Sequence, residues 1–303
     1  MTGAWRRLGR LALDTSAAPW AATHAALPIV EAVDDGVWRV YLSVRDAAGR
    51  AHIGTARLTM APEPALGPLD AEPALAPGPL GAFDDNGVTS SCLVADGERR
   101  LLYYTGWSRG VTVPFYLASG VAVSERGGPF RRLSPAPLLD RSPADPFLNA
   151  SPFVLVDDGT WRMWYVSATT WVETAEGPRH YYNIRYAASP DGLAWSRSGQ
   201  VAIDYAGDEH AFARPCVVRD GGVYRMWYAF RGDRYRIGYA ESADGIAWKR
   251  EDAVAGLLPA GDGWDGEMVE YPFVFDWRGS RFMLYNGNQY GGSGVGLARW
   301  ETA

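Results

Sequence analysis

The sequence predicts an all-β protein, a five-bladed β-propeller whose fifth blade is closed by the N-terminal strand. Three observations predict this fold class: a composition suited to short strands, a strand phrase that recurs five times, and a similarity between the start and the middle of the chain. The 303 residues include 13 Trp, 16 Tyr, 35 Gly and 20 Pro. Aromatic residues favour strands, and glycine and proline favour the tight turns that join them.

The recurring phrase identifies the repeating unit of the fold. It reads WRVYLSVR at Trp38, LLYYTGWS at Leu101, WRMWYVSA at Trp161, YRMWYAFR at Tyr224 and RFMLYNGN at Arg281, at spacings of 57 to 63 residues. Alternating bulky residues predict a half-buried strand in each copy. An apolar strand and a turn precede each phrase and a third strand follows it, so each unit is expected to be a four-stranded antiparallel meander. One meander cannot bury both faces, and radial stacking of five gives a propeller.

The two chain ends are expected to share the fifth blade. The fifth copy ends at Trp300, after its third strand, and AWRRLGRLALD from Ala4 resembles AWSRSGQVAID from Ala194, the fourth-strand sequence of another copy. An N-terminal strand beside the last strand would remove an exposed sheet edge. We therefore predict one domain over 1–303, with blades at about 24–80, 84–143, 145–206, 208–263, and 265–303 plus 4–14.

Charge and cysteine content exclude several classes of function. The chain has a net charge of −6, a pI near 5.3 and no basic run, which argues against nucleic acid or anionic membranes as partners. No stretch approaches the roughly 18 apolar residues of a membrane span, and Leu11 to Leu13 is too short for the core of a secretion signal. Cys92 and Cys216 suggest buried strand residues rather than disulfides. We expect a soluble, cytoplasmic protein.

Candidate site residues come from the loops that should meet at one mouth of the propeller channel. Four acids before the inner strands, Asp84, Asp145, Asp208 and Asp265, share one register and are interpreted as turn caps. Glu270 and Arg214 stand closer to the inner strands, where a charge needs a ligand or a partner, so an internal pair of Arg214 with Glu270 or Glu209 remains an alternative.

The remaining candidates are aromatic rings that stack on a sugar face and polar groups that bind its hydroxyls. The expected substrate-binding residues are His24, Asn86, Trp107, Asn149, Trp171, His180, His210, Arg214, Arg231, Glu270, Asn286 and Asn288.

Through its blade pattern, essentially the whole chain resembles the five-bladed propeller glycosidases, glycoside hydrolase families 43, 32, 62, 68 and 130 and their relatives. The resemblance implies a general acid opposite a base or nucleophile, with a third acid that tunes pKa and orientation. The chain departs from the family pattern, because family 43 enzymes usually place Asp before the inner-strand Pro. Here those slots hold Leu27, Ser90, Ser151 and Arg214, and no motif like the WMNDPNG of family 32 is present.

We therefore expect a glycoside hydrolase-like enzyme that acts on a small glycoside or sugar conjugate, with no cofactor. Cleavage requires two carboxyl groups that flank the anomeric carbon, one of them protonated. Glu209 and Glu267 are the expected acid/base pair, with Asp85 as the third carboxylate.

Two alternatives remain open. One is a divalent metal site made by His24, His180 and His210 with Glu209 or Glu270. The other, favoured by the missing Asp-Pro pairs, is a propeller that binds or processes a sugar or nucleotide sugar without hydrolysis.

Overall fold

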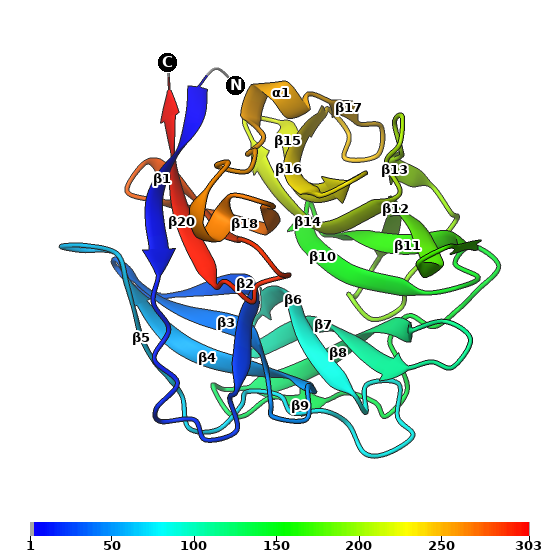
Figure 1. The fold of residues 1–303 in the computed structure, drawn as a ribbon, viewed down its shortest axis with the longest axis horizontal. Coiled ribbons are helices and arrows are strands. Elements are labelled where there is room, and N and C mark those ends of the chain that lie inside the picture. The colour runs from blue at the N-terminus through cyan, green and yellow to red at the C-terminus, as the bar shows by residue number, and fades with distance from the viewer. Residues whose placement is uncertain (1–2, 303) are drawn as a thin grey trace.

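The computed structural model of the protein describes residues 3–302, and strands dominate this range. The strands surround a common centre, and both ends of the chain lie together at the rim (Figure 1). Successive strands pair antiparallel in sets of four, and we interpret each set as one blade. The all-β prediction is thus confirmed, while the blade boundaries stay an interpretation of these pairings.

The strand bounds follow the predicted repeat. The first two sets are β2 (Thr23–Asp34), β3 (Val37–Arg45), β4 (Ala51–Thr59) and β5 (Ala65–Leu69), then β6 (Gly87–Asp96), β7 (Arg99–Arg109), β8 (Phe115–Glu125) and β9 (Arg131–Arg132). The next two are β10 (Asn149–Asp157), β11 (Thr160–Thr174), β12 (Gly177–Ser189) and β13 (Val201–Ile203), then β14 (Ala211–Asp220), β15 (Val223–Arg231), β16 (Tyr235–Ser242) and β17 (Lys249–Arg250). The last is β18 (Glu270–Trp277), β19 (Ser280–Asn286), β20 (Val295–Thr302) and β1 (Gly3–Leu11). The short helix α1 (Asp252–Ala255) and the 3₁₀ turn η1 (Gly263–Asp265) connect the fourth and fifth sets.

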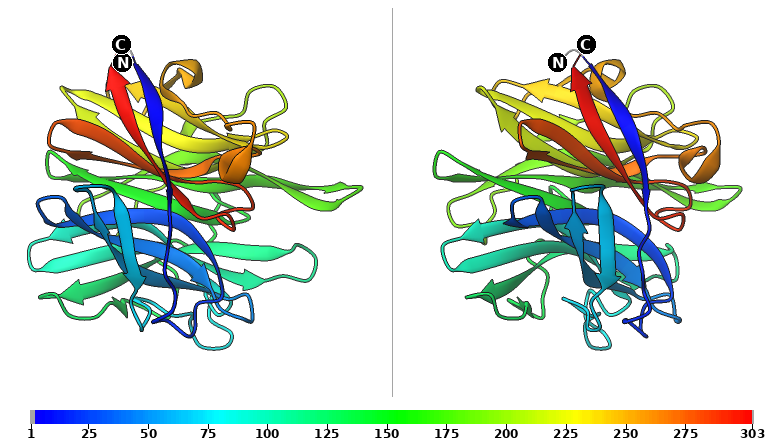
Figure 2. Two further views of the ribbon diagram at one scale, coloured as in Figure 1. Left: turned by 60° about the vertical axis from the view of Figure 1, so that its left-hand side comes forward. Right: turned by 90° about the vertical axis from the view of Figure 1, so that its left-hand side faces the viewer.

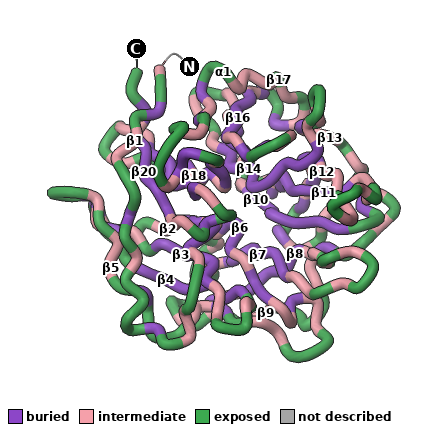
Figure 3. Tube along the Cα trace, in the orientation of Figure 1, coloured by how far each residue is buried: buried purple, intermediate pink, exposed green. Residues whose placement is uncertain are grey.

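The first strand of each set lies at the centre. Around the ring, β2 contacts β6, β6 contacts β10, β10 contacts β14, β14 contacts β18, and β18 returns to β2. Burial is greatest around this centre, whereas the peripheral loops are exposed (Figure 3). Cys92 and Cys216, on β6 and β14, are buried and free, as predicted. The central strands therefore bring five sequence repeats to one axis.

The N-terminal strand pairs with the C-terminal strand, as predicted. β1 runs antiparallel to β20 from Gly3 opposite Thr302 to Leu11 opposite Val295 (Figure 2). Trp5 anchors this pairing, because its ring contacts Trp300 at a centroid distance of 5.3 Å and its Nε1 donates to the Ala255 carbonyl at 2.9 Å. Edge pairing and a buried aromatic side chain both stabilise the contact between the two ends.

A repeated polar cluster joins the second strand of a set to its outer edge. In each, a buried or partly buried Asp accepts hydrogen bonds of 2.6 to 3.1 Å from a Tyr on the second strand and an Arg from the outer part of the set. The Asp–Tyr–Arg clusters are Asp84 with Tyr104 and Arg132, Asp145 with Tyr165 and Arg197, Asp252 with Tyr228 and Arg250, and Asp265 with Tyr285 and Arg7.

These clusters correct one sequence expectation. Asp84, Asp145 and Asp265 were expected to cap turns, but their carboxylates bind tyrosine hydroxyls and arginines instead. A carboxylate this deeply buried needs a charged or hydrogen-bonding partner, which an exposed turn cap does not. In the last cluster the arginine is Arg7 of β1, so the N-terminal strand supplies the same contact that an outer strand supplies elsewhere.

Candidate functional site

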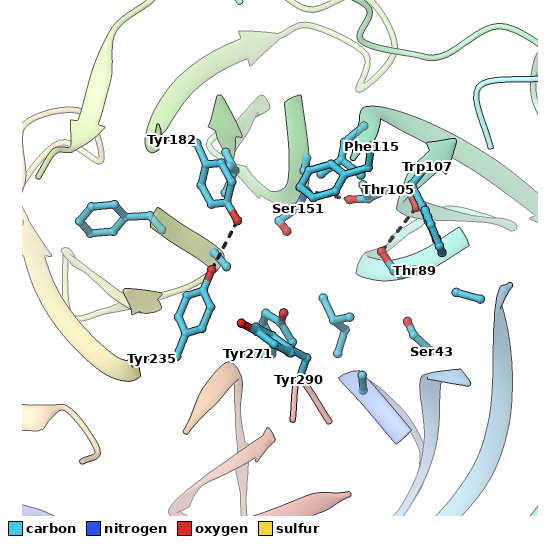
Figure 4. Close-up of a pocket in the computed structure, with 18 of the residues that line it drawn as sticks. Ser43, Thr89, Thr105, Trp107, Phe115, Ser151, Tyr182, Tyr235, Tyr271 and Tyr290 are labelled. Atoms are coloured by element: carbon cyan, nitrogen blue, oxygen red, sulfur yellow. Dashed lines mark hydrogen bonds between the residues drawn. The ribbon is translucent and has the colours of Figure 1, made fainter. Parts of the chain in front are cut away.

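A cavity of about 390 Å³ lies among the inner strands and the adjoining parts of the second and third strands. Hydroxyl-bearing side chains line much of it: Ser43, Thr89, Thr105, Ser151, Tyr182, Tyr235, Tyr271 and Tyr290. Tyr182, Tyr235 and Tyr271 occupy one side, and Ser43, Thr89 and Trp107 face them from the other (Figure 4). Its size and mixture of aromatic and polar groups suit a small ligand.

A backbone irregularity positions several of these side chains. Leu27, Ser151, Arg214 and Tyr271 each precede a proline and have φ between 50° and 55°. The strand register shifts at each of these points, as in a β-bulge. A non-glycine residue in this conformation costs on the order of 1–3 kcal/mol, and bulges redirect side chains next to functional sites. Three of the four residues, Leu27, Ser151 and Tyr271, line the cavity.

The tyrosines on one side of the cavity form a connected cluster. The hydroxyls of Tyr182 and Tyr235 are 3.4 Å apart, and Arg231 donates to the Tyr290 hydroxyl at 2.9 Å. The Arg231 guanidinium also lies over the Tyr235 ring, 5.3 Å from its centroid. The His180 ring stacks on Tyr182 with centroids 4.4 Å apart and planes within 3°. These contacts fix an array of hydroxyl and guanidinium donors along one wall.

Glu270 precedes Tyr271 in the chain and interacts electrostatically with Tyr182, Tyr235 and Arg231. Its side chain is fully buried, and neither carboxylate oxygen accepts a hydrogen bond from a described residue. Burial raises the pKa of Glu270 well above its usual value, and the Tyr271 hydroxyl and the Arg231 charge only partly oppose this. A buried carboxyl group avoids much of the desolvation cost by remaining protonated. Glu270 is therefore a buried acid whose raised pKa favours the protonated form, and it directly precedes Tyr271 of the cavity lining.

The histidines near the cavity are held neutral. Burial and the nearby charges of His210, Arg231 and Arg179 lower the pKa of His180 to about 4. Burial also lowers the pKa of His24 and of His210, with further contributions from the positive charges of Arg45 and Arg231 respectively. Neutral imidazoles can accept or donate a hydrogen bond without adding charge to the cavity.

Arg214 has a different environment from the one expected. It is fully buried and donates to main-chain carbonyls at the centre of the ring, to Pro28 at 2.9 Å and to Ser90. Described carboxylates lie beyond 4 Å of its guanidinium, so the structure does not contain the alternative internal pair of Arg214 with Glu270 or Glu209. Arg214 therefore links the fourth inner strand to the first and second, and burial lowers its pKa to about 10.

The three predicted catalytic acids do not line the cavity. Glu209 forms a bidentate pair with Arg250 at 2.6 and 2.8 Å, and Asp85 accepts from the Gly81 amide at 3.0 Å within its own loop. Glu267 is exposed. The central cavity therefore does not bring these three carboxylates together, since its lining includes none of them. Their catalytic roles stay a prediction that nothing in this geometry favours.

The predicted substrate-binding residues divide into lining and supporting groups. His24, Trp107, His180 and Arg231 line the cavity. Trp171 and His210 are not part of the lining, but both rings contact His180, at centroid distances of 5.4 and 6.2 Å respectively. Asn149, Asn286 and Asn288 instead bind main-chain groups of neighbouring loops, and Asn86 lies outside the lining with a buried amide nitrogen that lacks a partner.

Sequence reasoning did not select several lining residues that carry polar groups: Ser43, Arg45, Thr89, Thr105, Ser151, Tyr182, Tyr235 and Tyr271. Three signals could have found some of them. Tyr271 fills the slot before the inner-strand proline in the fifth repeat, and Arg45 stands at the eighth position of the strand phrase, as Arg231 does. Tyr182 and Tyr235 also share a repeat position, the first residue of YNIRYAAS and of YRIGYAES.

Two other predictions concern metals and membranes. Within residues 3–302, His, Cys, Asp and Glu side chains form no group of three or more that could hold a metal ion. His24, His180 and His210 therefore do not gather around a common acid in this range. Among the described helices, none is both long and apolar enough to span a membrane.

Solved structures share this fold over nearly the whole chain. The BT0996 RGII complex aligns with a TM-score of 0.75 at 17% identity, covering 99% of this protein and 92% of that one. A thermostable family-43 glycoside hydrolase aligns at 0.62 and 18%, covering 95% and 91%. The GH32 β-fructofuranosidase BmSUC1 of Bombyx mori aligns at 0.63 and 15%, covering 94% and 63%. This likeness shows that the protein shares the β-propeller fold of these structures.

Sequence comparison identifies two relatives that match the chain over almost its whole length. Uncharacterized protein Rv1502 and uncharacterized protein MT1551, from Mycobacterium tuberculosis strains ATCC 25618 / H37Rv and CDC 1551 / Oshkosh, are each 46% identical over 300 residues. The alignments cover 99% of this chain and 100% of each relative. The chain belongs to the family of these two mycobacterial proteins. No protein-family model matches the sequence.

Proposed function

We propose that the protein is a carbohydrate-active, glycosidase-like hydrolase that binds one sugar unit of a small glycoside in the central cavity. The observation that carries this proposal is Glu270, a fully buried carboxyl group without a hydrogen-bond partner, directly behind a tyrosine that lines the cavity. Such a group is costly for the fold and is typical of an acid kept protonated for proton transfer.

Tyr271 connects Glu270 to the ligand in this proposal. Glu270 itself does not reach the cavity lining, whereas Tyr271 does, and the adjacent groups influence each other's pKa. The Glu270 proton passes through the Tyr271 hydroxyl to the glycosidic oxygen as the bond from that oxygen to the anomeric carbon breaks. A water molecule then bonds to the anomeric carbon, and its proton returns to Glu270 through Tyr271. The lining supplies neutral His180 as a group that can orient this water.

The test is a panel of aryl glycosides that release a chromophore on cleavage. We expect Glu270→Gln and Tyr271→Phe each to lower kcat at least about 100-fold, since positioned acids and bases contribute roughly 10²- to 10⁴-fold. Glu63→Gln, on an exposed loop, is the matched control and should retain full activity. Wild-type kcat in both site variants would remove the pair from the mechanism.

A second candidate function is sugar or nucleotide-sugar binding without hydrolysis. It is supported by the lack of any Asp or Glu among the cavity-lining residues of the described chain, since most glycosidases need two carboxyl groups. Calorimetric titration of the same sugars distinguishes the two candidates. Saturable binding by the wild-type protein with no release of aglycone from any substrate would support the binding function and contradict the hydrolase.

A further inference from the structure

The charge of the cavity differs from that of the protein. The whole chain carries a net charge of −6. The lining contains two permanent cations, Arg45 and Arg231, and no carboxylate among the residues that the structure describes. The lining histidines have lowered pKa values and are neutral at pH 7. An acidic protein thus presents a positively charged pocket.

The two arginines hold the same position in the sequence repeat. Arg45 is the last residue of β3 and Arg231 the last residue of β15, the eighth position of the phrase in the first and fourth repeats. At the positions that strand pairing makes equivalent, the other three repeats have Trp107, Ala168 and Asn288. Equivalent strand ends meet at the same mouth of a propeller, so both cations face one ligand space. Because the other three repeats have no arginine at this position, the strand repeat itself does not require one. We therefore associate Arg45 and Arg231 with the ligand space at this mouth.

Arg45 has no polar partner within the described part of the chain. It is half-buried, and its guanidinium makes no hydrogen bond or ion pair with any residue between 3 and 302. Arg231 lacks a carboxylate within 4 Å as well, but it donates to Tyr290 and lies beside Glu270. By contrast, Arg132, Arg197 and Arg250 all pair with an Asp. A half-buried cation without a counterion is unfavourable unless a ligand supplies the missing charge.

The groups around Arg45 suit a sugar that carries an acid. Ser43 and Thr89 offer hydroxyls, and Trp107 offers a flat aromatic face on the same side of the cavity (Figure 4). A guanidinium binds a carboxylate or a phosphate through two parallel hydrogen bonds. A neutral sugar would satisfy the hydroxyls and the ring but leave the guanidinium without a counterion.

We propose that the ligand of the cavity is an acidic sugar, one that carries a carboxylate or a phosphate, and that this group pairs with Arg45. The proposal rests on the proposed function, since it assumes that a sugar occupies the cavity. Arg231 and Tyr290 then contact the sugar at the opposite side, next to the Glu270–Tyr271 pair.

The experiment compares sugars that differ only in charge. Calorimetric titration at low salt would use glucose, glucuronate and glucose 6-phosphate, and the corresponding galactose set, with acetate and inorganic phosphate as free anions. We expect an acidic member to bind roughly 10- to 100-fold more tightly than its neutral counterpart, the range expected for hydrogen bonds to a charged group. A uronate preference identifies a carboxylate, and a sugar-phosphate preference identifies a phosphate.

Variants assign the preference to Arg45. We expect Arg45→Gln to lower the affinity for the acidic sugar to that for the neutral sugar, while neutral-sugar affinity stays unchanged. Arg131→Gln, an exposed arginine on the outermost strand β9 of the second blade, is the matched control and should leave every affinity unchanged.

Three outcomes would overturn this inference. Equal affinity for neutral and acidic members would refute the acid requirement while the proposed function stands. Free phosphate or acetate that binds as tightly as the acidic sugar would mean an anion site without sugar recognition. If none of the sugars binds, the proposed function fails and this inference fails with it.

Discussion

The outer Asp–Tyr–Arg clusters and the region around the central cavity both contain acidic and arginine side chains. In the clusters these side chains pair with each other, whereas at the cavity Arg45 and Glu270 do not. In the clusters each carboxylate accepts hydrogen bonds from a tyrosine and an arginine, as Asp145 does from Tyr165 and Arg197. At the cavity Arg45 makes no such contact, and the oxygens of Glu270 have no partner among the described residues. Paired charges stabilise the blades, whereas a cation without a counterion or a buried acid without a hydrogen-bond partner costs stability. Under the proposed function, pairing rather than charge alone separates the residues that stabilise the blades from the candidate functional residues.

The largest change in the free energy of unfolding should come from removing the aspartate of one Asp–Tyr–Arg cluster. Asp145→Asn leaves Arg197 and Arg185 without their counterion in a site where the Asp145 side chain is 0 % exposed. We expect the free energy of unfolding to fall by roughly 3–5 kcal/mol, the cost of removing one partner from a buried pair. Urea unfolding followed by tryptophan fluorescence measures this. A loss below about 1 kcal/mol would mean that the clusters do not stabilise the blades.

Replacement of Glu270, by contrast, is expected to increase the stability of the protein. A carboxyl group with a raised pKa binds more protons in the folded than in the unfolded state, so its contribution to stability declines as pH rises above the usual 4.5. Glu270→Gln removes this penalty. The variant should become more stable than the wild type as pH increases from 5 to 8, by on the order of 1–2 kcal/mol at the upper end.

Melting temperatures of both proteins across this pH range provide the measurement. Asp145→Asn serves as the contrast, because removing a paired carboxylate should destabilise the protein at neutral pH. A difference between Glu270→Gln and the wild type that does not change with pH would contradict a protonated, unpaired Glu270.

The smallest changes in stability and in hydrolytic rate are expected for Glu267, the exposed acid that the sequence analysis placed in the catalytic pair. Glu267→Gln should change the free energy of unfolding by less than about 0.5 kcal/mol, as usual for exposed positions. Its hydrolytic rate should also match the wild type, because Glu267 does not line the cavity. Loss of turnover in this variant, with stability unchanged, would restore the assignment made from sequence and refute the distinction between paired and unpaired groups.

The sequence alone determined the strand repeat, the all-β class and the pairing of the two chain ends. These depend on local patterns: the alternation of buried and exposed residues along a strand, the chemistry of the turns, and the recurrence of a phrase at a nearly constant interval. The repeat also placed His24, Trp107, His180 and Arg231 at the channel mouth, and these four residues line the cavity. Their roles in binding a substrate stay a prediction.

Only the tertiary structure decided which polar residues are paired and which face the cavity. Glu209 and Glu270 look alike in the sequence, yet the first meets Arg250, 41 residues away, and the second meets no donor among the residues described. Whether a buried charge has a partner depends on side chains that distant strands bring together, and on bulges that turn residues such as Tyr271 toward the axis. Neither is encoded in the spacing of residues along a single strand.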